Sequence, residues 1–327
     1  MRGTQVLVTG AGGFIGGHLV ELLVREGASV RALVRYNSRN ERGTLDWIDE
    51  GVAADVDVQL GELRDVESVE RAIDGTEVVF HLAAQIAIPY SYVNARDYFE
   101  TNVLGSLNVA QAALRHGVRR VVHTSPSEVY GTAQTVPITE DHPLEAQSPY
   151  SASKIGADKL MDSFHRSHGL PVTVLRPFNT FGPRQSARAV IPTIITQALA
   201  GDVVRLGSTD PRRDLTYVED TARGFVAAAR TEAAVGRTVQ LGTGEAISVG
   251  EIVGRVAAIL GKELTVETDE ARVRPSQSEV QLLLSDPSRA RELLAWRPTI
   301  GIDEGLSRTI AWIDANATRF RLGDYVT

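Results

Sequence analysis

A glycine-rich turn between a short apolar strand and an amphipathic helix constrains the fold of this chain more than any other feature. Val6-Leu7-Val8 reads as a buried strand, and glycines follow it at Gly10, Gly13 and Gly16. This spacing lets bare backbone approach a pyrophosphate while the helix N-terminus directs amide donors at it. We therefore predict a dinucleotide site at this turn, with Phe14 and Ile15 opening the helix.

Strands and helices alternate after this turn. Further strands are predicted at 30–34, 78–80 and 120–123, with a helix over 98–116, and such alternation builds a doubly wound parallel α/β sheet. The dinucleotide-binding domain is predicted to span 1–177, with segments near 215–245 returning to it. A smaller C-terminal α/β substrate domain is expected over 178–327. The helices expected in the C-terminal half cover 190–200, 218–230, 249–260 and 304–315.

A tyrosine and a lysine four residues apart suggest redox chemistry on an alcohol. Tyr150 and Lys154 are predicted to share one face of a helix, where the ammonium can hold the phenol partly ionised. Glu128 stands upstream in the run Ser125-Pro126-Ser127-Glu128. It would supply a second base, able to remove a carbon-bound proton next to a newly formed ketone. Oxidation alone does not need that carboxylate.

Composition excludes some classes of function. The 327 residues carry a net charge of -7, which disfavours a sequence-independent nucleic-acid binder, and no nucleic-acid partner is expected. The absence of cysteine rules out disulfides and thiolate chemistry, and no metal is required. We see neither a signal peptide nor an apolar run approaching the roughly 20 residues that span a bilayer. A cytoplasmic protein without a membrane partner is expected.

Six motifs in this order resemble the extended short-chain dehydrogenase/reductase family, specifically its nucleotide-sugar epimerases, dehydratases and decarboxylases. The resemblance covers nearly the whole chain and implies a Rossmann fold. The motifs are the loop from Thr9 to Gly16, His81-Leu82-Ala83-Ala84, Asn102 in Thr101-Asn102-Val103, the Ser-Glu-Val-Tyr-Gly run from Ser127, Tyr150-Ser151-Ala152-Ser153-Lys154, and Arg176-Pro177-Phe178-Asn179.

Within that family, the segments 86–92 and 178–185 look most like GDP-mannose 4,6-dehydratases and dehydratases of N-acetylhexosamine nucleotides. The resemblance implies that Tyr150, assisted by Lys154, oxidises C4 of a nucleotide-diphosphate hexose. Glu128 would then remove the C5 proton, water would leave from C6, and hydride would return there. No external reductant is consumed.

Pro126 departs from this pattern, because these relatives carry a Thr or Ser hydroxyl at its position. Proline has neither a side-chain donor nor a backbone N–H. Ser125 or Ser127 would therefore have to contact the sugar hydroxyl that is oxidised.

Two other functions remain open. A nucleotide-sugar 4-epimerase or a uronic-acid decarboxylase would use the same tyrosine and the same 4-ketone. A non-catalytic dinucleotide-binding scaffold or redox-sensing regulator would result if Pro126 had ended the chemistry. Decarboxylases also carry the Ser-Glu-Val-Tyr-Gly run. An epimerase has no use for a base at C5, so Glu128 separates an epimerase from a dehydratase.

The cofactor is expected to be NAD or NADP. The second strand ends in Arg35 followed by a loop with Ser38, without the carboxylate typical of NAD sites, and this favours NADP. The resemblance implies that Glu62 lies near the adenine and that Lys154 contacts the nicotinamide ribose. It also assigns these residues to the cofactor: Leu63, Leu82, Ala83, Ala84, Asn102, Tyr150 and Pro177.

Substrate contacts are expected mainly from the second domain. Arg184, Arg213 and Arg274 are candidates for binding the diphosphate. The resemblance adds Ile88, Tyr90, Asn179 and the position of Pro126 to the sugar site. It also implies a homodimer formed through the helix that carries Tyr150 and the long helix before it, with Leu104, Val109 and Leu160 as candidate contacts.

Overall fold

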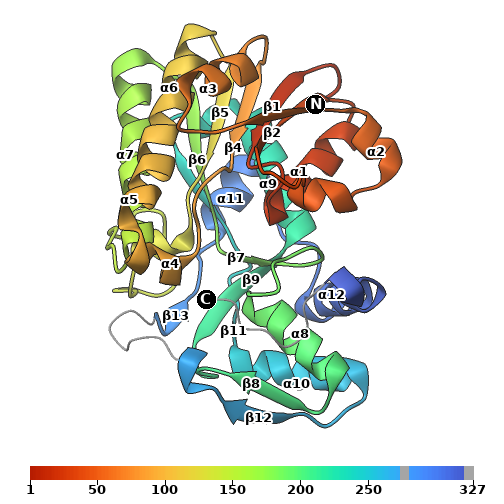
Figure 1. Ribbon diagram of the computed structural model, residues 1–327. Helices are drawn as coiled ribbons and strands as arrows, with labels where there is room; N and C mark the ends of the chain where they lie inside the picture. The colour runs from red at the N-terminus through yellow and green to blue at the C-terminus, as the bar shows by residue number, and fades with distance from the viewer. Residues whose placement is uncertain (273–279, 320–327) are drawn as a thin grey trace.

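The computed structural model describes residues 1–272 and 280–319. Its centre is a seven-stranded parallel sheet with the strand order β10-β6-β5-β4-β1-β2-β3 (Figure 1). The predicted doubly wound sheet is therefore confirmed. The strands are β1 (Gln5–Thr9), β2 (Ser29–Arg35), β3 (Val56–Gly61), β4 (Val78–His81), β5 (Arg120–Thr124), β6 (Val172–Pro177) and β10 (Thr238–Leu241).

Helices cover both faces of this sheet, because successive side chains of a strand point to opposite faces. In β1, Val6 and Val8 join one core and Leu7 joins the other. The first core includes residues of α1 (Phe14–Arg25), α9 (Val218–Arg230) and α11 (Ser288–Leu294). The second includes residues of α3 (Val66–Ile73), α6 (Gly105–Arg115) and α7 (Pro149–His168). Strand β10, α9 and α11 thus return from the C-terminal half.

The start of α7 is fixed by its own sequence. Ser148 forms a capping box with Ser151, and Pro149 occupies the first turn. Gly169 ends the helix in the left-handed conformation, with φ 71°. Tyr150 therefore lies in the first turn of a firmly capped helix, at the edge of the sheet where the parallel strands end.

The second unit lies below the main sheet in Figure 1 and packs around its own apolar core. Its strands are β7 (Asn179–Phe181), β9 (Arg212–Tyr217), β11 (Ala246–Ser248) and β13 (Leu282–Leu283), and a separate pair, β8 (Val203–Leu206) and β12 (Thr265–Thr268). Its helices are α8 (Val190–Ala200), α10 (Val249–Leu260) and α12 (Ile302–Ala315).

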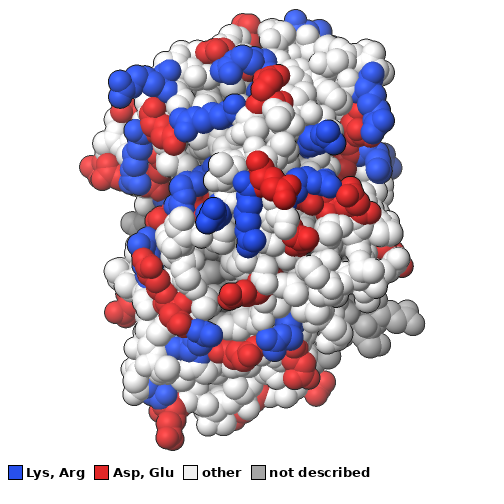
Figure 2. All heavy atoms as spheres, turned by 180° about the vertical axis from the view of Figure 1, so that it is seen from behind, with Lys and Arg blue, Asp and Glu red and all other residues white. Residues whose placement is uncertain are grey.

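Short helices complete the chain: α2 (Glu50–Ala54), α4 (Ile88–Val93), α5 (Ala95–Tyr98), η1 (Gly43–Trp47), the π-helical turn η2 (Phe99–Leu104), η3 (Ser127–Tyr130), η4 (Glu232–Ala234), η5 (Glu270–Arg272) and η6 (Ala317–Arg319). The helix predicted over 98–116 is continuous through η2 into α6. Figure 2 shows acidic and basic side chains interspersed on the rear face. None of the helices in the described ranges is long and apolar enough to cross a bilayer.

Candidate active site

A cavity of about 730 Å³ opens at the carboxyl ends of the parallel strands, where α/β folds of this type bind ligands. Segments that follow β1, β4, β5 and β6 line it. Most of the predicted cofactor residues are among the lining: Gly10, Gly13, Phe14, Ile15, Gly16, Arg35, Glu62, Leu63, Leu82, Ala83, Ala84, Tyr150, Lys154 and Pro177.

The glycine turn leaves no room for side chains. Gly10 has φ 71°, and a Cβ there would lie 2.7 Å from the backbone nitrogen of Ala83. A Cβ on Gly16 would lie 2.2 Å from the carbonyl oxygen of Gly10. The N-cap of α1, Gly13, makes no side-chain cap hydrogen bond. Bare backbone beside an uncapped helix N-terminus fits the pyrophosphate of a dinucleotide.

Two predicted cofactor residues do not line the cavity. Ser38 is exposed, and the cavity is lined at this loop by Asn37 and Glu41 instead. Asn102 is buried and does not reach the cavity. Its Oδ1 accepts a hydrogen bond from the backbone N–H of Gln85 at 2.8 Å, and its Nδ2 donates to Ser153 Oγ at 2.9 Å. Asn102 therefore holds the loop after β4 against α7.

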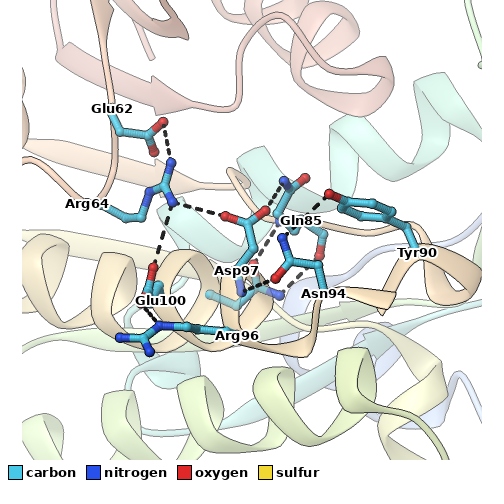
Figure 3. A network of polar contacts seen from close by, with 9 residues as sticks. Glu62, Arg64, Gln85, Tyr90, Asn94, Arg96, Asp97 and Glu100 are labelled. Carbon is cyan, nitrogen blue, oxygen red and sulfur yellow. Dashed lines mark hydrogen bonds and ion pairs between the residues drawn. The ribbon is translucent and has the colours of Figure 1, made fainter. Parts of the chain in front are cut away.

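A polar network joins part of the cavity lining to α5 (Figure 3). Arg64 pairs with Glu62 at 3.5 Å and donates to Asp97 at 3.0 Å. The other Asp97 oxygen accepts from Gln85 Nε2 at 2.7 Å. Glu62, Arg64 and Gln85 all line the cavity. The sequence reasoning missed Arg64 and Gln85, because neither lies in a motif that it used.

The catalytic candidates meet on one side of the cavity, which we call the catalytic wall: Ser125, Glu128, Tyr150 and Lys154. Ser125 directly follows β5, Glu128 lies in the turn η3, and α7 supplies the others. Tyr150 is 7% exposed and Lys154 4% exposed. Pro126 and Ser127 also line the cavity, so the structure brings all the predicted catalytic residues together.

Burial is the main cause of the pKa shifts of Tyr150 and Lys154. It raises the pKa of Tyr150 well above its usual range, and the carboxylate of Glu128 raises it further. Burial also lowers the pKa of Lys154 to about 8, although Asp158 partly opposes this shift. These shifts run against the expectation that Lys154 keeps the phenol partly ionised, because desolvation and nearby carboxylates favour the neutral phenol in the protein alone.

Asp158 anchors the catalytic wall from behind. It accepts hydrogen bonds from Ser125 Oγ at 2.6 Å, Arg176 at 2.8 Å and His123 at 3.1 Å. Burial alone would raise the pKa of Asp158, but the hydrogen bond from His123 and the charge of Arg176 outweigh it and bring the pKa to about 2. Asp158 is thus an ionised carboxylate one helical turn beyond Lys154, a role that no motif indicated.

Three hydroxyls close to Pro126 in the chain could replace the one that proline lacks. The hydroxyl of Ser125 is committed to Asp158 and Arg176. Ser127 Oγ lies 3.5 Å from a Glu128 oxygen. Thr124 lines the cavity, and its buried Oγ1 has no hydrogen-bond partner among the described residues. Thr124, which the sequence reasoning did not consider, is therefore the hydroxyl least committed elsewhere.

A second side of the cavity, here called the recognition wall, consists of Asn179, Thr180 and Gln185. Gln185 Nε2 donates to the Thr180 carbonyl at 3.0 Å. Asn179 Oδ1 and Gln185 Oε1 are buried without partners in the described part of the chain. Such oxygen atoms can accept hydrogen bonds from a ligand. Asn179 was predicted to contact the substrate, and Gln185 was not.

The predicted diphosphate arginines are not brought together. Arg184 is buried outside the cavity, where it pairs with Glu21 and His18 of α1, so its assignment to the diphosphate is wrong. Arg213 does not line the cavity and donates to the Arg212 carbonyl at 3.1 Å. Arg274 lies outside the described residues.

Tyr90 also lies outside the cavity. It is 46% exposed, and its hydroxyl accepts a hydrogen bond from Asn94 at 3.5 Å (Figure 3). Its predicted contact with the sugar is therefore not supported by the geometry. Ile88, two residues earlier in the same helix α4, does line the cavity.

Comparison with known proteins decides the family. A family model described as GDP-mannose 4,6 dehydratase matches residues 7–309. The chain belongs to the nucleotide-sugar dehydratase and epimerase family. It is 35% identical to a dTDP-glucose 4,6-dehydratase of Streptomyces griseus, over 94% of each chain. It is 32% identical to a UDP-glucose 4-epimerase of Mycolicibacterium smegmatis, over 94% of this chain and 97% of the relative.

A solved structure extends the similarity to the whole fold. A dTDP-glucose 4,6-dehydratase double mutant from Streptomyces venezuelae, solved with NAD, superimposes with a TM-score of 0.86 at 29% identity and covers 98% of this chain and 99% of its own. The predicted fold, family and enzyme class are confirmed. The relatives support the predicted dehydratase reaction and include the epimerases of the alternative.

Proposed function

We propose that this protein is an NAD(P)-dependent nucleotide-sugar 4,6-dehydratase. The observation that carries the proposal is the shared position of Glu128 and Tyr150. Both line one cavity with the glycine turn, and the carboxylate is close enough to raise the pKa of the phenol. A base for an alcohol and a base for a carbon acid in one cavity match a reaction that first makes a ketone and then eliminates water.

The dinucleotide fits the glycine turn, the uncapped start of α1 and the adjacent loops. When bound, nicotinamide supplies a hydride acceptor and donor whose oxidised ring carries positive charge. Tyr150 is neutral in the protein alone; added positive charge lowers its pKa, so that the phenol releases its proton to solvent and the phenolate becomes the base. It then takes the proton of the sugar 4-hydroxyl while Lys154 stabilises the phenolate.

Glu128 acts on the ketone that results. The 4-carbonyl acidifies the C5 hydrogen, and the carboxylate removes that proton. The C6 hydroxyl then leaves as water with a proton from Glu128, and the hydride that bound nicotinamide would have taken from C4 would be returned to C6. C5 is then reprotonated, and this uptake balances the proton that Tyr150 accepted from the 4-hydroxyl. The 4-keto-6-deoxy product has lost one water, and no reductant is consumed overall.

The test is a mass-spectrometric screen of GDP-, UDP-, CDP- and dTDP-hexoses and of the corresponding hexuronates, which carry the carboxylate that a decarboxylase removes. A dehydratase yields a product lighter by one water, a decarboxylase loses carbon dioxide, and an epimerase leaves the mass unchanged. Absence of any turnover with bound dinucleotide would favour the non-catalytic scaffold. A screen that finds an unchanged mass and an inverted C4 centre would contradict the dehydratase.

Two variants assign the steps. Tyr150→Phe should lower turnover by about 10²–10⁴-fold and block formation of reduced cofactor. Glu128→Gln should lower product formation by a similar factor but still allow C4 oxidation, so reduced nicotinamide should accumulate in a single turnover. The matched control is Glu67→Gln on α3, whose side chain is 88% exposed. An epimerase would tolerate Glu128→Gln as well as Glu67→Gln.

For the cofactor we infer a preference for NADP. Arg35 is exposed at the end of β2 and lines the cavity, so its guanidinium can pair with a 2′-phosphate. Solved relatives contain NAD, which makes the distinction worth measuring. Arg35→Gln should weaken NADP about tenfold in a titration and leave NAD nearly unchanged. Equal affinity of the native protein for both would overturn the preference.

We also propose a cytoplasmic homodimer formed through η2, α6 and α7. Leu104 and Phe99 are 51% and 44% exposed, as expected of contacts between copies. Val109 is fully buried in the core under α6, so its predicted place in the interface is wrong. Leu104→Glu should yield monomers in sedimentation. Native monomers would contradict the proposal.

A further inference from the structure

The buried arginine that misses the cavity joins the two units of the molecule. Arg184 lies in the loop between β7 and α8, and the cavity is lined on either side of it by Asn179 and Thr180 of β7 and by Gln185. Its guanidinium is 7% exposed and pairs with Glu21 of α1. Helix α1 is the one whose N-terminus faces the cavity at the glycine turn. One side chain therefore ties the recognition wall to the helix that meets the dinucleotide.

His18 completes this contact and fixes its geometry. Burial and then the charge of Arg184 lower the pKa of His18 to about 3, so the imidazole is neutral. A neutral ring has one donor and one acceptor. The Pro183 carbonyl can only accept, so Nε2–H donates to it at 2.9 Å and Nδ1 accepts from Arg184 at 2.7 Å. In this tautomer the 3.3 Å contact between Arg184 Nε and Nε2 is not a hydrogen bond.

The backbone of the loop is held in conformations that few residues adopt. Arg184 has φ 67°, which is uncommon for a residue with a side chain and persists where surrounding contacts enforce it. Gly182 has φ 151°, and a Cβ there would lie 2.6 Å from Val218 Cγ1 at the start of α9. The loop thus has little freedom to move independently of α1 and α9.

We propose that Arg184 is a positioning residue that couples the dinucleotide end of the cavity to the sugar-nucleotide end. Pyrophosphate contacts hold the N-terminus of α1, and through Glu21 and His18 this fixes the loop that carries Asn179 and Gln185. Binding at either end then favours binding at the other, since coupling between sites is reciprocal. This proposal rests on the proposed function only in requiring both ligands in one cavity.

The test measures binding rather than turnover. The holoprotein is loaded with reduced dinucleotide, and the rate of its loss on dilution is followed by fluorescence with and without saturating GDP, UDP, CDP or dTDP. In the native protein the effective nucleotide should slow the loss by about fivefold or more. In Arg184→Met the nucleotide should change the rate by less than about twofold.

Further variants separate coupling from damage to the fold. Arg184→Met leaves the buried carboxylate of Glu21 with only the exposed Arg25, 3.5 Å away. Glu21→Leu/Arg184→Met removes both charges of the buried pair and should fold well while also lacking the coupling. Arg184→Lys keeps the charge and should restore part of the effect. Arg308→Met makes the same change at a 44% exposed arginine that pairs with Glu219, and should keep native coupling.

The outcomes are distinct. No slowing by any nucleotide in the native protein, or native slowing in a folded Glu21→Leu/Arg184→Met, overturns the proposal. Loss of slowing in the Arg184 variants, with Arg308→Met unaffected, supports it. Water loss is measured independently in the substrate screen. If the nucleotide slows cofactor loss but no substrate loses water, only the dehydratase assignment fails. If a substrate loses water but no nucleotide slows cofactor loss, only the coupling proposal fails.

Discussion

The catalytic wall and the recognition wall of the cavity treat their buried polar groups differently. Behind the catalytic wall, Asp158, Arg176 and Ser125 pair with one another at 2.6–3.1 Å. On the recognition wall, Asn179 Oδ1 and Gln185 Oε1 are buried without partners among the described residues. Paired groups fix side-chain positions before any ligand arrives, whereas unpaired acceptors are satisfied only when a ligand donates to them.

This difference suggests a division of labour. The reaction needs its bases at fixed places, and the ion pair of Asp158 with Arg176 holds the strand end and helix that carry them. Recognition must match a particular sugar, and acceptors left open can select its donors. Mutations should therefore affect stability on one wall and affinity on the other.

The largest expected effect is on the catalytic wall. Asp158→Asn removes a buried carboxylate that is 5% exposed and leaves Arg176 uncompensated. The free energy of unfolding should fall by about 3–5 kcal/mol in urea denaturation. The control is Asp162→Asn on the same helix, because Asp162 is 38% exposed and its pair with Arg166 should be worth under about 1 kcal/mol. Equal losses in the two variants would contradict the role given to the network.

A second, opposite effect should come from Lys154. Burial lowers its pKa from 10.5 to about 8, so below pH 8 the folded protein carries a charge that burial disfavours. Lys154→Met should raise the free energy of unfolding by about 3 kcal/mol at pH 7 while activity is lost.

The pH dependence of that gain follows from proton binding. Between the folded pKa of about 8 and the unfolded value of 10.5, Lys154 of the unmutated protein binds more protons in the unfolded state than in the folded state. The stability of the unmutated protein therefore rises with pH relative to that of Lys154→Met. The advantage of the variant should therefore shrink between pH 8 and about 9.5, below the range in which unfolded tyrosines ionise. A pH-independent difference would show that the charge of Lys154 is not what destabilises the native fold.

The sequence predicted the catalytic side better than the recognition side, for physical reasons. The glycine turn, Tyr150, Lys154 and Glu128 lie in local patterns whose geometry follows from a single strand, turn or helix. Arg184 and Gln185 are adjacent in the chain, yet one points to α1 and the other into the cavity. That choice depends on the left-handed backbone at Arg184 and on Glu21, 163 residues away, which no local pattern reveals.

The smallest expected effect tests the recognition wall by itself. Gln185→Leu removes an unpaired buried acceptor and one hydrogen bond to Thr180, so stability should change by less than about 1 kcal/mol. If Oε1 accepts from the substrate, KM should rise about fivefold to tenfold with little change in kcat, because a contact made equally in the ground and transition states is lost. Gln197→Leu is a control on α8, since Gln197 hydrogen-bonds only backbone groups in the described part of the chain. A fall in kcat without a change in KM would instead place Gln185 among the groups that act on the transition state, and the division between the two walls would fail.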